Sequence, residues 1–155
     1  MKFEHLVQIN DPLNPLLDPL TRDQLWRGLK RRAENPKEFV LALDAADIST
    51  SSDNTLTRTL SFGRLQIRDH VTLVPEREVR YDIEAAAEVP GGTLVMRIEE
   101  PAEEQLFVRF AYDTKAIAGG PPRDAYYDQY VKQAYVEADV DSIVTIRRLI
   151  VEGKL

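Results

Sequence analysis

Two residues of opposite charge lie across from each other in a predicted β-hairpin, and they are the first candidates for chemistry. The segment 62–65 reads Phe-Gly-Arg-Leu, with glycine at the first central position that a type II′ turn requires. The flanking strands then pair Arg58 with Asp69 on a face that otherwise carries leucine, isoleucine, valine and phenylalanine. Because an unpaired ion on such a face is strongly destabilising, the register predicts an ion pair.

The sequence leaves two roles open for this ion pair. In the first, the pair fixes the register of the hairpin and has no other role. In the second, Asp69 orients Arg58 within an apolar cavity, and the guanidinium contacts an oxygen atom of a bound ligand. A shift of one residue in the strand register would place both side chains in solvent and contradict both interpretations.

Histidine is scarce and cysteine is absent, which excludes whole classes of reaction. The chain has 2 histidines and no cysteine, so cysteine nucleophiles, thiolate metal sites and three-histidine zinc sites are impossible. We expect no metal and no cofactor. His5 lies on the apolar face of the first predicted strand, either as a hydrogen-bonded core residue or as a base, whereas His70 lies on the outer face. The sequence assigns no catalytic residue.

Other inward-facing side chains would complete a pocket around these groups. Tyrosine hydroxyls inside a cavity can orient a ligand, although tyrosines at these spacings also serve as ordinary core residues. The residues that we expect to line a ligand cavity are His5, Arg58, Asp69, Tyr81, Met96, Phe110, Tyr112, Tyr127, Tyr130 and Val131.

Hydrophobic periodicity predicts the elements that position these residues. Alternation predicts a strand over 2–10, and a capping box at 21–24 (Thr-Arg-Asp-Gln) begins a helix that Asn35-Pro36 ends. Residues 37–43 indicate a second short helix. Period-two alternation then predicts strands over 46–52, 55–62, 65–74, 78–86, 92–100 and 105–113. A long helix follows over 124–152, with Tyr127, Val131, Ala134, Tyr135, Ala138, Ile146 and Leu149 on its apolar side.

This order of elements predicts a single α+β domain over residues 1–155. The strands form one antiparallel sheet, and the last helix, about 43 Å long at a rise of about 1.5 Å per residue, is the only element long enough to cover its face. A twisted sheet wrapped around one helix leaves space between them, so we expect a lined cavity there.

The charge balance limits the partners that the protein can have. The 20 lysines and arginines against 26 aspartates and glutamates give a net charge of −6, which argues against nucleic acid and anionic membranes. The sequence contains no apolar run long enough for membrane insertion and no pattern of a signal peptide. We expect a cytoplasmic monomer or homodimer whose partner is an apolar small molecule.

Several segments carry a resemblance to a known family. They are 3–10 (Phe-Glu-His-Leu-Val-Gln-Ile-Asn), 20–29 (Leu-Thr-Arg-Asp-Gln-Leu-Trp-Arg-Gly-Leu), 32–36 (Arg-Ala-Glu-Asn-Pro), 62–63 (Phe-Gly), 67–69 (Ile-Arg-Asp) and 106–110 (Leu-Phe-Val-Arg-Phe). In these segments the chain resembles the AtaL-like family, a domain of unknown function in the SRPBCC superfamily of START and Bet v 1-like proteins. The resemblance implies a helix-grip fold, in which a curved, seven-stranded antiparallel sheet wraps a long C-terminal helix and two short helices follow the first strand.

The resemblance also implies a hydrophobic cavity that binds lipids, sterols, polyketides or other apolar molecules, while some branches are cyclases or hydrolases. Our leading hypothesis is therefore binding of a hydrophobic or aromatic small molecule that carries a polar group. An enzyme of the polyketide cyclase type, or a hydrolase, is the alternative: Arg58 would stabilise an enolate-like oxygen, and His5 or Asp69 would act as the base. A chaperone-like interaction module is a third possibility, and it would need an exposed apolar patch.

Overall fold

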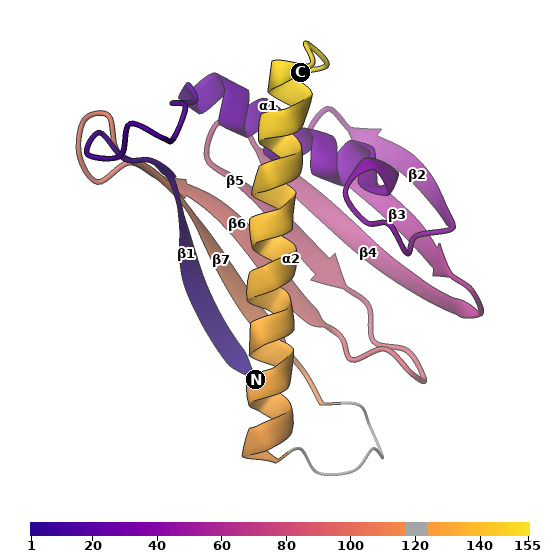
Figure 1. The fold of residues 1–155 in the computed structure, drawn as a ribbon. Coiled ribbons are helices and arrows are strands. Elements are labelled where there is room, and N and C mark those ends of the chain that lie inside the picture. The colour runs from indigo at the N-terminus through magenta and orange to yellow at the C-terminus, as the bar shows by residue number, and fades with distance from the viewer. Residues whose placement is uncertain (117–123) are drawn as a thin grey trace.

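The computed structural model describes residues 1–116 and 124–155, and within them seven antiparallel strands form one curved sheet (Figure 1). The strands are β1 (Lys2–Asn10), β2 (Ala45–Ser52), β3 (Thr55–Phe62), β4 (Leu65–Val74), β5 (Glu78–Ile83), β6 (Gly92–Glu99) and β7 (Leu106–Thr114). Their order in the sheet is β1-β7-β6-β5-β4-β3-β2. Strands β2 to β7 thus pair with their neighbours in the sequence, whereas β1 joins the sheet beside β7.

Two helices and one short 3₁₀ turn complete the described part of the chain: α1 (Arg22–Glu34), η1 (Pro36–Glu38) and α2 (Ala125–Val151). The capping box that begins α1 is confirmed, because Thr21 and Gln24 accept hydrogen bonds from each other's backbone N–H groups. The second short helix is reduced to η1 and does not extend over 37–43. Leu41, beyond the turn, is fully exposed, whereas Leu43 is buried.

The register predicted for the first hairpin is confirmed. Gly63 has a φ of +59°, as the first central residue of a type II′ turn requires. Arg58 lies opposite Asp69 in the pairing of β3 with β4, and β5 continues the same parity with Tyr81 opposite Val71. The inward-facing side chains of these strands are therefore the ones that alternation assigned to the core.

The helices cover one face of the sheet, where α2 runs along it and α1 crosses near the C-terminal end of α2 (Figure 1). Leu25 and Leu29 of α1 are completely buried in the common core, together with Ile146 of α2. At Gly28, a Cβ atom would lie only 2.5 Å from the Cγ2 atom of Ile146. The two helices cross closely because this position has no side chain.

The face that α2 turns towards the sheet differs from the predicted apolar side in its first half. Ala134 and Ala138 are exposed, and Asp139 and Ser142 are buried in their place. The burial of Ile146 sets this rotation, since residues three to four and seven positions earlier share its face. Hydrophobicity alone assigns an aspartate to solvent, so the prediction selected alanines on the neighbouring face.

Candidate functional site

The ion pair between Arg58 and Asp69 is present and buried, with both residues 3% exposed. The Nε and Nη2 atoms of Arg58 donate to the two carboxylate oxygens of Asp69 over 2.8 and 2.6 Å. The Nη1 atom donates to the backbone oxygen of Ala33 over 3.0 Å. Every nitrogen of the guanidinium thus has a partner within the protein, and the pair connects the sheet with the last turn of α1.

A second buried carboxylate, Asp139, joins α2 to the first and last strands. Asp139 is 1% exposed; His5 Nε2 lies 2.7 Å from its Oδ2 atom, and the Tyr112 hydroxyl donates to both oxygens over 2.8 Å. Burial raises the pKa of the Asp139 carboxyl, although the hydrogen bonds from His5 and Tyr112 oppose this shift. Burial and the nearby charge of Asp139 also raise the pKa of the Tyr112 hydroxyl. Of the predicted site residues, His5 and Tyr112 are therefore brought together by a partner that the prediction missed.

Aromatic rings surround this carboxylate on the inner face. His5 stacks between Phe3 and Phe110, with ring-centre distances of 5.5 and 5.2 Å, and the Tyr112 ring stacks on Tyr135 at 4.1 Å. The side chain of His5 keeps 13% of its surface exposed. The arrangement combines flat apolar surfaces with a few polar atoms, which is the usual composition of a small-molecule site.

A cation that the sequence analysis did not consider, Arg32 of α1, lies beside the predicted site residue Tyr81. The Cζ atom of Arg32 is 5.3 Å from the centre of the Tyr81 ring, and that of Arg58 is 5.0 Å away. The Nε atom of Arg32 donates to Ser142 Oγ over 3.2 Å. Arg32 lies seven positions after Leu25 on the same helix. The helical spacing of Leu25 and Leu29 could therefore have indicated that Arg32 faces the core.

Two of the predicted cavity residues lie elsewhere, which corrects the expectation for the first half of α2. Tyr127 is 50% and Tyr130 68% exposed, because the rotation of α2 directs positions 127 and 130 away from the sheet. Val131 is half-buried, whereas Met96 and Phe110 are completely buried in the core.

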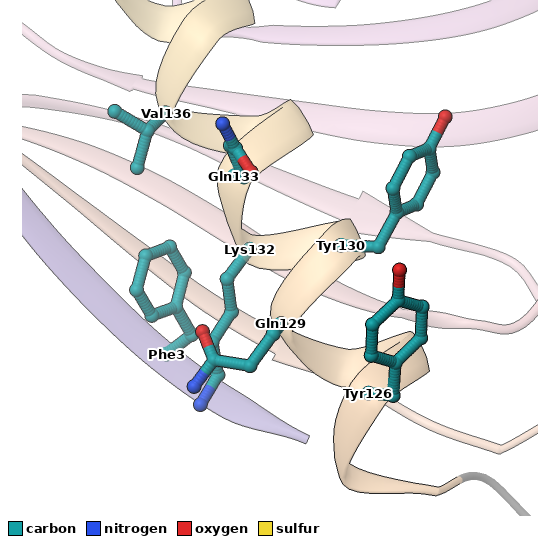
Figure 2. A pocket seen from close by; sticks show the side chains of 7 residues that line it. All are labelled: Phe3, Tyr126, Gln129, Tyr130, Lys132, Gln133 and Val136. Atoms are coloured by element: carbon teal, nitrogen blue, oxygen red, sulfur yellow. The ribbon is translucent and has the colours of Figure 1, made fainter.

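A groove of about 490 Å³ follows the outward side of α2 beside β1. Figure 2 shows its lining residues, which are Phe3, Tyr126, Gln129, Tyr130, Lys132, Gln133 and Val136. It contains neither Asp139 nor the ion pair of β3 and β4, and of the inner aromatic rings described above it includes only Phe3.

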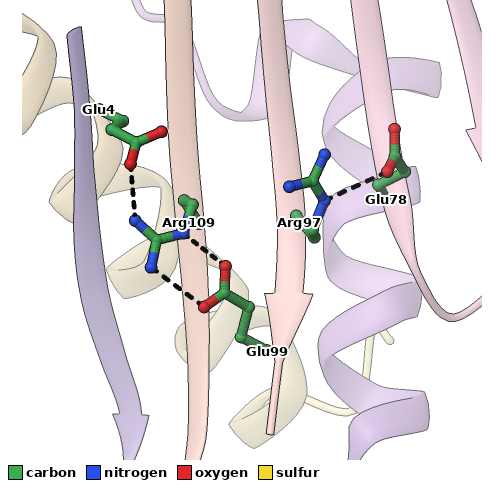
Figure 3. A network of polar contacts seen from close by, with 5 residues as sticks. All are labelled: Glu4, Glu78, Arg97, Glu99 and Arg109. Carbon is green, nitrogen blue, oxygen red and sulfur yellow. Dashed lines mark hydrogen bonds and ion pairs between the residues drawn. The ribbon is translucent and has the colours of Figure 1, made fainter. Parts of the chain in front are cut away.

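The outer face of the sheet carries a different set of charges (Figure 3). Arg109 contacts Glu4 and Glu99, and Arg97 contacts Glu78. The hydrogen bond that Arg109 donates to Glu99, together with the positive charge of Arg109, lowers the pKa of Glu99. These side chains are 25% to 60% exposed, and exposed pairs of this kind add only about 0–1 kcal/mol to stability. They form a solvated surface and add no group to the inner site.

The described residues offer no candidate cluster of metal ligands and no candidate membrane-spanning helix. Those residues contain no group of three or more His, Cys, Asp or Glu side chains that could hold a metal ion. None of the helices in residues 1–116 and 124–155 is long and apolar enough to cross a membrane.

Comparison with known proteins establishes the family. The family model described as "Acetylaranotin biosynthesis cluster protein L" (AtaL) matches residues 7–153. The chain belongs to the AtaL family. The matched part of this AtaL-family protein includes Arg32, Tyr81 and Asp139, whereas His5 lies just before it. No curated protein matches the chain by sequence.

Solved structures show that the AtaL-family protein has the helix-grip fold. The di-domain aromatase/cyclase StfQ of the steffimycin biosynthetic pathway aligns with a TM-score of 0.73 at 10% identity, over 98% of this chain and 51% of that one, so the chain spans about half of StfQ. The Zhui aromatase/cyclase from Streptomyces sp. R1128 aligns at 0.65 and 18% identity, over 97% and 95% of the two chains. Ara h 8.0201 aligns at 0.62 and 14% identity, over 96% and 98%.

Removal of Asp69 should strongly destabilise the protein. The substitution Asp69→Ala leaves Arg58 buried without a carboxylate, so we expect the free energy of unfolding to fall by about 3–5 kcal/mol in urea denaturation. Replacing both partners, as Arg58→Met with Asp69→Leu, should recover most of that loss, since no charge is then buried. The matched control is Asp82→Ala, which breaks the exposed pair with Arg80 and should cost less than about 1 kcal/mol. Equal losses in the free energy of unfolding for Asp69→Ala and Asp82→Ala would contradict the interpretation of Arg58 and Asp69 as a buried ion pair.

The stability conferred by Asp139 should depend on pH in a defined direction. An unfolded aspartate loses its proton near pH 3.8, and folded Asp139 keeps it to a higher pH, so unfolding releases a proton between these two values. The free energy of unfolding therefore falls as pH rises through this window, by up to about 1.4 kcal/mol per pH unit. Urea denaturation at several pH values should show Asp139→Asn gaining stability relative to the unmutated protein as pH rises. A stability difference that does not change with pH would contradict the raised pKa.

Proposed function

We propose that this protein binds an apolar or aromatic small molecule that carries a polar group, between the sheet and α2. The single observation that carries the proposal is the composition of the inner face. A half-buried His5, bonded to Asp139, lies among stacked aromatic rings instead of within an aliphatic core. Flat rings can stack on an aromatic ligand, and the few polar atoms can orient it.

The known relatives support the ligand class. StfQ and Zhui are aromatase/cyclases, and they share the fold of this chain. A polyketide-like or other aromatic compound is accordingly the ligand that we propose, and the inner polar cluster is the place at which its oxygen atoms would be recognised.

A cyclase-like activity in the same place is the second candidate, and the pair of His5 and Asp139 favours it. His5 uses Nε2 to contact Asp139, while its Nδ1 atom makes no hydrogen bond with a described residue. The Asp139 carboxylate orients the imidazole, and the lone pair on Nδ1 is then available to take a proton from a C–H group between two carbonyls. A hydrolase-like reaction would use the same base to activate water.

Binding should depend on the inner rings and not on the groove along α2. Titration with Nile red, a neutral fluorophore, should show saturable binding, which Tyr135→Ala weakens roughly three- to tenfold by removing the ring stacked on Tyr112. The matched control is Tyr126→Ala, which removes an exposed tyrosine of the same helix in the groove and should leave the affinity unchanged. A loss of affinity in Tyr126→Ala alone would place the probe in the groove and contradict the proposal.

The cyclase-like alternative predicts catalysis of enolisation. The protein should accelerate exchange of the acidic C–H of 1-phenyl-1,3-butanedione with deuterium from the solvent, measured by NMR. His5→Gln should abolish the acceleration, because amide nitrogen is not basic, whereas His70→Gln changes an exposed histidine on the outer face and should have no effect. Equal rates with and without protein would contradict the enzymatic alternative and leave binding as the function.

A further inference from the structure

Arg32 is a cation of the inner cluster whose hydrogen-bonding capacity the protein does not use up. Its Nε atom donates to Ser142 over 3.2 Å, and its guanidinium also interacts with the nearby Tyr81 side chain, but it forms no ion pair with a described carboxylate. Arg58 differs in this respect, because all three of its nitrogens have protein partners. Of these two arginines, Arg32 is therefore the one able to accept a ligand.

The hydroxyl of Tyr81 lies at the same place, near the Arg32 guanidinium, and its proton has no acceptor among the described residues. Tyr81 is 2% exposed, and its oxygen atom is buried with no hydrogen-bond partner in the described part of the chain. Buried polar groups in folded proteins are almost always hydrogen-bonded. One ligand oxygen group that accepts from both Tyr81 and Arg32 would satisfy the two at once.

The charges around Arg32 favour an anion as that ligand group. Asp69 neutralises Arg58 at 2.6 Å, and the Asp139 carboxylate is already held by two donors. Arg32 has no carboxylate within ion-pair distance among the described residues. Burial lowers the pKa of its guanidinium, but interactions with Tyr81, Tyr112 and Asp139 outweigh this effect and raise the pKa above its ordinary value. The group thus stays charged.

We propose that Arg32 and the Tyr81 hydroxyl form the subsite for a negatively charged oxygen of the ligand, namely a carboxylate or an ionised phenol or enol. This proposal rests on the proposed binding function and specifies the polar group that the ligand carries. A guanidinium offers two parallel N–H donors that match the two oxygens of a carboxylate, and the tyrosine adds a third donor. The ion pair of Arg58 with Asp69 then serves to support the Tyr81 ring, instead of binding the ligand itself.

A matched pair of ligands tests this subsite. Nile red bound to the protein is displaced with 2-naphthoate, an anion, and with methyl 2-naphthoate, its neutral ester. We expect the unmutated protein to bind the anion more tightly than the ester. Arg32→Met should weaken the affinity for the anion about tenfold or more, while the affinity for the ester changes less than about threefold. Arg27→Met is the control, because Arg27 lies on the same helix in an exposed pair with Asp23 and should leave both affinities unchanged.

Tyr81→Phe keeps the test decisive even if Arg32→Met fails to fold. This change removes a hydroxyl whose proton has no acceptor among the described residues, so the melting temperature should not fall, yet the preference for 2-naphthoate over its ester should shrink several-fold. A lower melting temperature with an unchanged preference would overturn the subsite and assign the hydroxyl a structural role. Equal displacement by anion and ester in the unmutated protein would overturn the subsite while binding stands. Failure of Nile red to bind would overturn the proposed function itself.

Discussion

A buried carboxylate on α2 sets the arrangement on which the inner face of this protein depends. An ionised group as buried as Asp139 is stable only when donors surround it, and those donors come from β1 and β7 as His5 and Tyr112. These two strands are the first and last in the described chain, and they become neighbours because β1 joins the sheet beside β7. The same contact therefore requires the rotation of α2 that also buries Ile146, and it determines which polar atoms face the inside.

The polar groups form a connected layer between α1, α2 and the sheet. Arg58 connects β3 and β4 to the end of α1 through the backbone of Ala33, and Arg32 connects α1 to α2 through Ser142. Both guanidinium groups lie over the ring of Tyr81. Arg58, Asp69 and Ser142 in this layer are buried, so their hydrogen bonds act with little competition from water. Such a layer suits recognition of oxygen atoms on an otherwise apolar molecule.

Much of the sheet could be predicted, whereas the rotation of α2 could not. The period of two residues and the turn at Gly63 leave a single register in which Arg58 meets Asp69, and the structure has that register. On a helix, the apolar side is inferred from hydrophobicity averaged over several turns. A single buried aspartate shifts this average, and the positions of Tyr127 and Tyr130 were wrong for that reason.

The order of elements, the strand register and the presence of one ion pair inside the hairpin could all be inferred from the amino-acid sequence. These features follow from local chemistry, namely turn residues, side-chain alternation and the cost of an unpaired charge. Which charges beyond the hairpin meet depends on how the helices and the sheet pack in three dimensions. Asp139 and His5 are separated by 134 residues and Arg32 and Ser142 by 110, and no short-range pattern records such contacts, because they arise where two helices and the sheet pack together.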